Sequence, residues 1–444
     1  MRIEPKRWVI GVVMVVSASL AFAGCGSGEP EPSGSIDWNN KDQRAAQFVL
    51  ALVDGDYAAA ASGFDTDMRK ALGTFGLQRA WEATVKQAGG FLEIVGTEIL
   101  PHEQYEIYEV TSRHELSGVK TRIVFSTDGR VAGLFFSYVD NDDWDMTPVV
   151  KEGYTDIPII LGEGGDYPLN GWLSMPDGVL GAVPAVVLVH GSGPSDKNET
   201  ISGITVFADI ADYLAKHGVA VLRYDKRTYA HGSKVVEQYG DQLTVKEETI
   251  DDAVAAKNLL AADVRIDSAR IYVVGHSLGG MLAPRIVAEG DFAGAVIMAG
   301  SPRSLIDIIE DQNRYFIALM DISEAERDRL LAEVEQARKD RFTLPAVYIE
   351  EMDAHPVADY LTTTNKPFLI LQGSKDFQVY ADVDFVAFQQ MTAGQANVSY
   401  GLYEGLTHLF TKSTMDQPTL DDYLPGSTVD PAPLADIVAW LLAH

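Results

Sequence analysis

The hydrophobic pattern of the chain changes near residue 150. Beyond it, short apolar runs rich in β-branched residues alternate with longer stretches in which apolar residues recur at helical spacing. The runs predict strands at 154–161, 169–175, 185–190, 219–224, 271–274, 294–299, 368–371 and 398–403, and the stretches predict helices at 207–216, 245–260 and 278–288. This alternation predicts a doubly wound, mostly parallel sheet with helices on both faces, in which ligands bind at the carboxyl ends of the strands.

The segment from 38 to 147 has a pattern typical of a small α+β domain. Helical spacing over 42–53 and a second helical stretch ending near Ala88 precede strand-like runs at 91–99, 105–115, 120–126 and 131–139. Asp128 and Gly129 predict a hairpin turn between the last two runs. His102 and His114 stand alone, and we expect them at the surface. We find no nucleophile–base pair or metal-ligand cluster in this sequence, which favours a packing or presentation role.

Regular alternation stops after Gly300. Residues 302 to about 361 have helical spacing at 305–320 and 323–340, followed by a shorter helix before Tyr360, and the strand pattern resumes at 368. A helical insertion between two strands of a parallel sheet predicts a cap over the carboxyl ends of the strands. The alternative is a helical excursion that packs elsewhere. The second domain, residues 150–444, therefore contains both a sheet and a candidate cap.

The first 24 residues have the pattern of a signal peptide. A basic start precedes an apolar run that ends just before Cys25, the only cysteine in the sequence. The segment 20–25 resembles the lipobox of bacterial lipoproteins, so Cys25 is a candidate for lipidation. Residues 25–37 then form a flexible tether rich in Gly, Ser, Pro and Glu. We expect an extracytoplasmic protein held to the bacterial membrane by a lipid; the alternative is a secreted protein with an incidental cysteine.

The balance of charges limits the partners. The formal net charge is −29 at pH 7, and apolar residues make up 46% of the sequence. So acidic a body disfavours direct binding to nucleic acid or anionic lipid, which leaves the lipid anchor as the expected link to a membrane. The charge favours neutral or cationic substrates over anionic ones.

A nucleophile motif lies between the strand at 271–274 and the helix at 278–288. Residues 275–279 read G-H-S-L-G, and a G-x-S-x-G sequence in this setting exposes its serine on a strained strand-to-helix turn. Ser277 is therefore the candidate nucleophile. The backbone N–H of Leu278 points into the same space and is a candidate donor to an oxyanion.

A serine nucleophile needs a base and an orienting acid, which follow it in the order acid then histidine in this kind of fold. Asp376 follows the strand at 368–371, and His408 follows the strand at 398–403. Asp382 and Asp384 compete for the acid role but are predicted to lie in a helix. His355 competes for the base role but falls in the presumed cap.

A second oxyanion donor is expected from an earlier loop. Residues 187–194 read V-L-V-H-G-S-G-P, in which an apolar strand ends at His190 and Gly191. The N–H of Ser192 can then face the site, and we predict that His190 is structural.

Together these motifs resemble those of bacterial α/β-hydrolase carboxylesterases of the secreted or lipid-anchored kind, which carry a small N-terminal domain of the DUF3887 type. The matching stretches are HGSGPSDKNET, VLRYDKRTYAHG, TVKEETIDDAVAA, VVGHSLGGMLAPRI, LQGSKDFQV and EGLTHLF. The small domain is similar to cystatin-like or NTF2-like domains. The resemblance implies Ser277 as nucleophile, Asp376 as acid, His408 as base, and Ser192 and Leu278 as oxyanion donors. It implies short acyl esters as substrates. The mechanism requires no metal or organic cofactor. Residues 223–227 match a family stretch, and we expect them to form a structural ion-pair cluster.

Two other functions remain open. An aminopeptidase or amidase of the same fold would need an acidic pocket for the substrate amine, and the cap supplies acids at Glu310, Asp311, Glu350, Glu351 and Asp353. A cell-envelope lipoprotein that binds ligands without turnover is the alternative outside enzymes. It would have no need for a complete set of nucleophile, base and acid.

Overall fold

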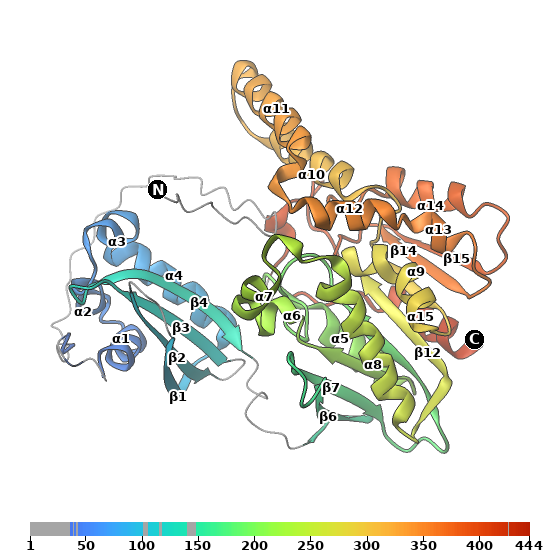
Figure 1. Ribbon diagram of the computed structural model, residues 1–444, viewed down its shortest axis with the longest axis horizontal. Coiled ribbons are helices and arrows are strands. Elements are labelled where there is room, and N and C mark those ends of the chain that lie inside the picture. Colours follow the sequence, from blue (N-terminus) through green and yellow to red (C-terminus); the bar gives the residue numbers. More distant parts are fainter. Residues whose placement is uncertain are drawn as a thin grey trace. The chain divides into compact units, whose positions relative to one another are not determined.

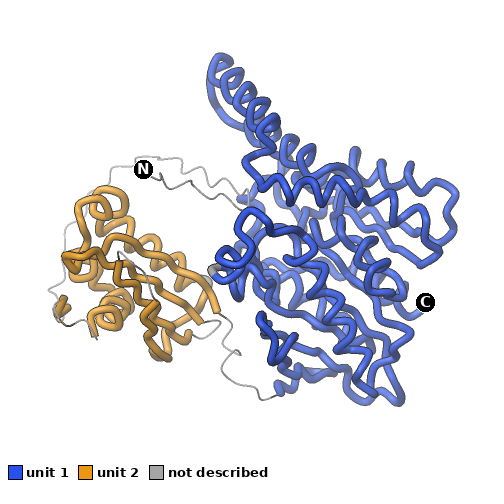
Figure 2. The backbone as a smooth tube through the Cα atoms, in the orientation of Figure 1, with its two compact units in different colours: residues 1–15, 147–444 blue, residues 16–146 orange. Residues whose placement is uncertain are grey.

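The structure is a computed structural model that describes residues 36–38, 40, 43–100, 105–114, 118–139, 148–424 and 426–444. The described residues form two compact units, which divide near residue 147 (Figure 2). The predicted signal peptide, most of the tether, Cys25 and His102 lie outside the described residues.

The smaller unit packs helices against a four-stranded antiparallel sheet with the order β1-β2-β3-β4 (Figure 1). Its elements are α1 (Arg44–Val53), α2 (Tyr57–Ser62), α3 (Thr66–Ala71), α4 (Gly73–Ala88), β1 (Phe91–Leu100), β2 (Glu106–His114), β3 (Gly118–Phe125) and β4 (Val131–Val139). Gly129 turns the β3–β4 hairpin with φ +80°, a backbone angle that glycine adopts without steric cost. A shared core joins α1 to the sheet, with Phe48 and Phe125 fully buried. The predicted α+β fold is confirmed.

The prediction of a surface position for His114 is wrong. Its side chain is fully buried at the end of β2, and its ring makes edge contacts with Trp81 and Phe91. Nδ1 lies 3.1 Å from Gly89 O and Nε2 lies 3.1 Å from Ser112 Oγ, so both ring nitrogens have partners. Burial lowers the pKa of His114, which keeps the ring neutral inside an apolar core.

The described part of the larger unit is built on a nine-stranded sheet with the order β15-β14-β13-β12-β8-β11-β7-β6-β5. The strands are β5 (Val149–Val150), β6 (Tyr154–Leu161), β7 (Leu169–Pro176), β8 (Val183–Val189), β11 (Ala220–Tyr224), β12 (Ile266–His276), β13 (Ala295–Met298), β14 (Phe368–Gly373) and β15 (Val398–Tyr403). The strands from β15 to β11 pair in parallel, and β7, β6 and β5 extend the sheet in antiparallel fashion. The doubly wound, mostly parallel sheet is therefore confirmed.

Apolar side chains cover both faces of this sheet. Within β8, Ala185 and Val187 belong to one core, and Val186 and Leu188 belong to the other. The first core includes α8 (Asp251–Ala262) and α9 (Leu278–Gly290), and the second includes α5 (Val206–Lys216) and α15 (Pro431–Ala443). A strand buried on both faces has a continuous apolar sequence, which is the pattern that identified β8.

Shorter elements connect the layers. They are β9 (Thr200–Ile201), β10 (Ile204–Thr205), α6 (Arg227–Ala230), α7 (Gly232–Tyr239), α14 (Val386–Met391) and 3-10 turns at Gly240–Gln242, Arg341–Thr343 and Leu420–Asp422. The helix predicted at 245–260 begins with a π-helical turn, Lys246–Ile250, before it continues as α8. Such turns occur often at functional sites.

The segment between β13 and β14 is helical, as predicted. It contains α10 (Leu305–Leu319), α11 (Glu324–Lys339), α12 (Ala346–Ala354) and α13 (Val357–Leu361), and Figure 1 shows α11 projecting away from the sheet. Gln312 on α10 donates to Gln378 O on the loop after β14, at 3.1 Å. These helices therefore contact the carboxyl end of the sheet. Among the described residues, no helix is long and apolar enough to cross a membrane.

Ion pairs hold α11 to α10. Arg338 on α11 lies 2.6 Å from Asp307 on α10 and also pairs with Glu310. Val334 is the one residue of α11 that is buried. Partly exposed ion pairs therefore contribute to the contact between these two helices, beside the buried Val334.

Candidate active site

Ser277 occupies a tight turn between β12 and α9. Its backbone angles are φ 54° and ψ −116°, and its N–H donates to Met298 O at 2.8 Å. The flanking glycines leave room for neighbouring backbone, because a β-carbon at Gly275 would lie 2.3 Å from Gly279 O. A β-carbon at Gly279 would lie 2.1 Å from Val189 O, the last residue of β8. The G-x-S-x-G sequence is thus required by close packing of the turn against the sheet.

Asp376 and His408 form a buried pair. His408 Nδ1 lies 2.7 Å from Asp376 Oδ2, and both side chains are almost fully buried. The backbone N–H groups of Gln378 and Val379 donate to Asp376 Oδ1, and Gln372 Nε2 donates to Oδ2. An ionised carboxylate accepts all four of these bonds, so His408 Nδ1 carries a hydrogen, and in the neutral ring the acceptor is then Nε2.

The residue next to Ser277 connects the nucleophile turn to His408. His276 Nε2 lies 3.0 Å from His408 O, and the two imidazole rings have centroids 4.9 Å apart. The structure therefore brings the loops that carry Ser277, Asp376 and His408 together at the carboxyl ends of β12, β14 and β15.

The competing candidates have other contacts. Asp384 is fully buried and binds Arg303 and Ser301, and Asp382 is exposed on the π-helical turn Ala381–Phe385. His355 Nδ1 lies 2.5 Å from Tyr360 Oη within the cap. None of these three meets the other candidate catalytic residues through a hydrogen bond or ion pair in the described part of the chain.

Two backbone N–H groups at this site lack an acceptor within the described residues. Ser192 follows Gly191 in the loop after β8, and its N–H makes no hydrogen bond there. Leu278 begins α9, where the first N–H of a helix has no intrahelical partner. A β-carbon at Gly191 would lie 3.6 Å from Ser277 Oγ, so the loop after β8 runs directly against the candidate nucleophile.

A buried ion pair lies behind this loop. Glu199 Oε1 accepts from Gly191 N at 2.7 Å, and Glu199 Oε2 lies 3.0 Å from His276 Nδ1. Burial alone would lower the pKa of His276, but the Glu199 carboxylate raises it above its usual value. The Oε2–Nδ1 contact is an ion pair whose N–H is not well aligned for a hydrogen bond.

His190 has a structural environment, as the sequence predicts. Its Nε2 lies 2.9 Å from Asp196 O, and its ring packs against Phe207. Burial lowers the pKa of His190 to about 4, which makes the ring neutral in the folded protein.

Further buried charges follow along the stretch 223–227. Arg223 pairs with Asp156 at 3.3 Å, and Arg227 pairs with Asp252. Lys226 is 2% exposed. Its Nζ donates to Gly191 O at 2.9 Å and lies 3.2 Å from Glu248 Oε1. The sequence predicts an ion-pair cluster here, but it does not reveal the bond from Lys226 to the loop beside Ser277.

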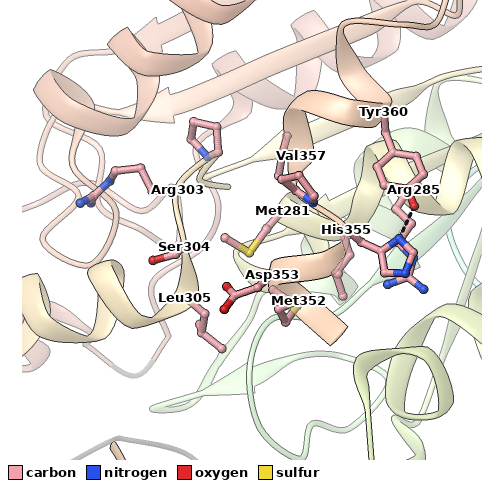
Figure 3. Close-up of a pocket in the computed structure, with 13 residues that line it drawn as sticks. Met281, Arg285, Arg303, Ser304, Leu305, Met352, Asp353, His355, Val357 and Tyr360 are labelled. Atoms are coloured by element: carbon pink, nitrogen blue, oxygen red, sulfur yellow. Dashed lines mark hydrogen bonds between the residues drawn. The ribbon is translucent and has the colours of Figure 1, made fainter. Parts of the chain in front are cut away.

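A cavity of about 120 Å³ lies between α9 and the cap (Figure 3). Met281, Leu305, Met352 and Val357 supply apolar wall, and Ser304, Arg285 and Asp353 supply polar groups. Met281 lies one helical turn beyond Ser277, since its N–H donates to Ser277 O at 2.9 Å. Within the described ranges, no group of three or more His, Cys, Asp or Glu side chains is arranged to hold a metal ion.

The chain belongs to the alpha/beta hydrolase family. Residues 186–420, more than half of the sequence, match the model of that family. Residues 45–134 match a second family, described as a protein of unknown function, DUF3887. A curated relative is Esterase EstD of Thermotoga maritima, which is 32% identical over 409 residues, covering 90% of this chain and 95% of the relative. The resemblance inferred from the motifs is confirmed.

Solved structures of the same fold have lower identity. Est1E from Butyrivibrio proteoclasticus is 18% identical with a TM-score of 0.43, covering 65% of this chain and 99% of that one. The esterase Pf2001 of Pyrococcus furiosus is 21% identical with a TM-score of 0.39, covering 58% of this chain and 83% of that one.

Proposed function

We propose that the protein is a serine carboxylesterase in which Ser277 is the nucleophile, His408 the base and Asp376 the acid. The observation that carries this proposal is the buried 2.7 Å contact between His408 and Asp376 beside the strained turn of Ser277. An oriented, neutral imidazole with a free Nε2 is what a serine hydroxyl needs for activation. EstD, a relative over nearly its whole length, bears the name of an esterase.

The chemistry proceeds through an acyl-enzyme. Ser277 Oγ bonds to the ester carbonyl carbon while its proton moves to His408 Nε2, and the carbonyl π electrons become an oxyanion. The N–H groups of Ser192 and Leu278 stabilise that oxyanion. Its collapse breaks the bond to the alcohol oxygen, which takes the proton from His408. Water then attacks the acyl carbon while His408 takes its proton. Collapse of the second oxyanion breaks the bond to Ser277 Oγ, which regains the proton from His408, and the acid is released.

The cavity under the cap is small, and one of its walls is Met281, one helical turn beyond Ser277. Its volume of about 120 Å³ is below the ~300–1,000 Å³ of sites that hold drug-sized ligands. Met281, Val357 and Leu305 offer an apolar lining for a few methylene groups. We therefore propose acyl groups of a few carbons as the preferred substrates.

Ion pairing within the cap disfavours the aminopeptidase alternative. Glu310, Asp311 and Glu351 each pair with an arginine at 2.6–2.7 Å, which disfavours their use in holding a substrate amine. Glu350 lies 3.7 Å from Arg341 and is exposed. Asp353 lines the cavity and is exposed, but a single carboxylate beside Arg285 gives little net negative charge. Ester substrates without a charged amine are thus favoured.

The test is covalent labelling combined with a substrate panel. A fluorophosphonate probe is expected to label Ser277 alone, and Ser277→Ala is expected to lose both labelling and turnover while it keeps its fold. The wild type should have higher kcat/KM for nitrophenyl acetate and butyrate than for longer nitrophenyl esters or matched aminoacyl anilides. Activity that rises towards long chains would refute the short-acyl proposal, and faster anilide cleavage would identify a peptidase.

We also propose that Cys25 carries a diacylglyceryl group and holds the enzyme on the outer face of the membrane. The apolar leader, the single cysteine and the polar tether support this location. Two acyl chains are enough for stable anchoring, where one is marginal. Mass spectrometry of the membrane fraction should find a mature chain that begins at lipidated Cys25, and an unmodified chain that begins elsewhere would contradict the proposal.

A further inference from the structure

The peptide unit between Gly191 and Ser192 has its two ends in different environments. Its carbonyl oxygen accepts from Lys226 Nζ at 2.9 Å, and its N–H is the Ser192 group that lacks an acceptor in the described chain. A trans peptide unit is planar, with its C=O and N–H pointing in opposite directions. No cis peptide bond occurs in the described residues, so fixing the carbonyl of Gly191 fixes the direction of the Ser192 N–H.

We propose that Lys226 is a positioning residue for the oxyanion hole: by binding Gly191 O, it orients and polarises the Ser192 N–H that faces the reacting carbonyl. This inference rests on the proposed esterase function and names a further residue of the same site. Lys226 does not touch the substrate; it acts through one peptide unit.

The charge on Lys226 strengthens this effect. A hydrogen bond from an ammonium to a carbonyl withdraws electron density along the amide, which makes the N–H at the other end a stronger donor. Because Lys226 is 2% exposed, water does not screen the interaction. The oxyanion forms only during the reaction, so the gain is greatest in the transition state.

The ammonium group of Lys226 is itself held in place by Glu248, which in turn is bound by the cap. Glu248 in the π-helical turn lies 3.2 Å from Lys226 Nζ and is 4% exposed. Tyr348 on cap helix α12 donates to the other oxygen of Glu248 at 2.7 Å. The preceding peptide unit is fixed as well, because Gly191 N donates to Glu199 at 2.7 Å. Opposite buried charges therefore bind the two polar groups of Gly191, and one of those charges is linked to the cap.

The first experiment compares Lys226→Met with a matched control in the full-length protein. Lys197→Met is the control because Lys197 is equally buried in the same region, 3.9 Å from Asp225, with no bond to Gly191 O. Loss of a whole oxyanion donor costs about 10²–10³ in kcat, so weakening one donor should lower kcat by about 10–100-fold. We expect KM to change by less than about threefold, since ground-state binding is not involved. Lys197→Met should leave kcat within about threefold of the wild type.

A double variant separates positioning from stability. Lys226→Met leaves the carboxylate of Glu248 buried without its cation, which destabilises the fold. Lys226→Met combined with Glu248→Gln removes that lone charge and should recover much of the thermal stability. If Lys226 positions the donor, kcat stays low in this double variant. Recovery of kcat together with stability would show that Lys226 is merely structural and would overturn the proposal.

Binding of a transition-state analogue gives a third readout. A trifluoromethyl ketone adds to the nucleophile and forms a tetrahedral oxyanion, so its inhibition constant should rise by the same factor as kcat/KM falls in Lys226→Met. If Ser277 is not a nucleophile, the wild type is inactive and unlabelled by fluorophosphonate, and both ideas fall. If the wild type is labelled but cleaves anilides faster than esters, the esterase proposal alone falls, because amide hydrolysis passes through the same oxyanion. If only the Lys226 role is wrong, the wild type is active and labelled, and kcat is either unchanged in Lys226→Met or recovered together with stability in the double variant.

Discussion

The Ser277→Gly variant should have a larger free energy of unfolding than the Ser277→Ala variant. Both substitutions remove the hydroxyl, so both variants lack turnover, and they differ only in the β-carbon. The backbone at this position has φ 54° and ψ −116°, a conformation that a residue with a β-carbon adopts only under strain. Elsewhere in a folded chain, alanine is normally the more stabilising of the two residues.

The magnitude follows from two opposing terms. Holding a non-glycine residue in such a region costs about 1–3 kcal/mol, and glycine removes that cost. Glycine also gives the unfolded chain more conformational freedom, which destabilises the fold by about 0.5–1 kcal/mol relative to alanine. The Ser277→Gly variant should therefore be more stable than Ser277→Ala by about 1 kcal/mol, or about 2–4 °C in Tm for a domain of this size.

Calorimetry on the two variants measures this difference. Ala332→Gly serves as the control, because Ala332 is exposed within α11 and glycine there should cost about 1 kcal/mol. The sign of the Gly–Ala difference should thus reverse between the two positions. An alanine variant at 277 that is as stable as the glycine variant, or more stable, would refute the argument that the turn stores strain.

Three further predictions concern neighbouring residues. Gly191→Ala would place a methyl group 3.1 Å from Ser277 Cβ and should lower kcat by about 10–100-fold. Stopped-flow or steady-state kinetics would check this against Gly232→Ala, where no atom lies within 4 Å and kcat should not change. Gly279→Ala would place its β-carbon 2.1 Å from a backbone carbonyl and should destabilise the fold by about 3 kcal/mol or more, seen as a lower midpoint in denaturant. His190 should make stability depend on pH: burial lowers its folded pKa to about 4 while the unfolded chain has about 6.5. The contribution of His190 to the free energy of unfolding is fully present above pH ~6.5 and falls by about 3 kcal/mol as the pH drops to ~4. Urea unfolding of the wild type and of His190→Gln across this pH range would measure the change as a difference between the two proteins. A pH-independent difference between those two proteins would contradict the assigned burial effect.

The order of strands and helices in the larger unit could be predicted because local sequence carries that information. The apolar run at 271–274 and the glycines of the G-x-S-x-G sequence predict a strand that lies within β12 and a helix that begins where α9 begins, although β12 itself starts earlier, at Ile266. The π-helical turn at Lys246–Ile250 was missed, because one extra residue in a turn hardly alters the hydrophobic period.

Contacts between distant residues could not be predicted in the same way. Glu199 and His276 are far apart in sequence, and each lies in a stretch whose local pattern is explained without the other. The burial of His114 depends on Trp81 and Phe91, which come from different elements. The sequence predicts that Lys226 belongs to an ion-pair cluster, but its bond to Gly191 depends on the register of β8 beside β11, which only the folded sheet defines.

The attachment of α11 through ion pairs makes the cap sensitive to the salt concentration around the enzyme. Ion pairs between exposed groups are screened by dissolved salt, whereas the apolar core beneath the sheet is not. The ion pairs of Arg338 with α10 should therefore weaken at high ionic strength and strengthen at low ionic strength, while the fold of the sheet stays the same. At an extracytoplasmic location, the salt concentration outside the cell would set how strongly α11 is held against α10.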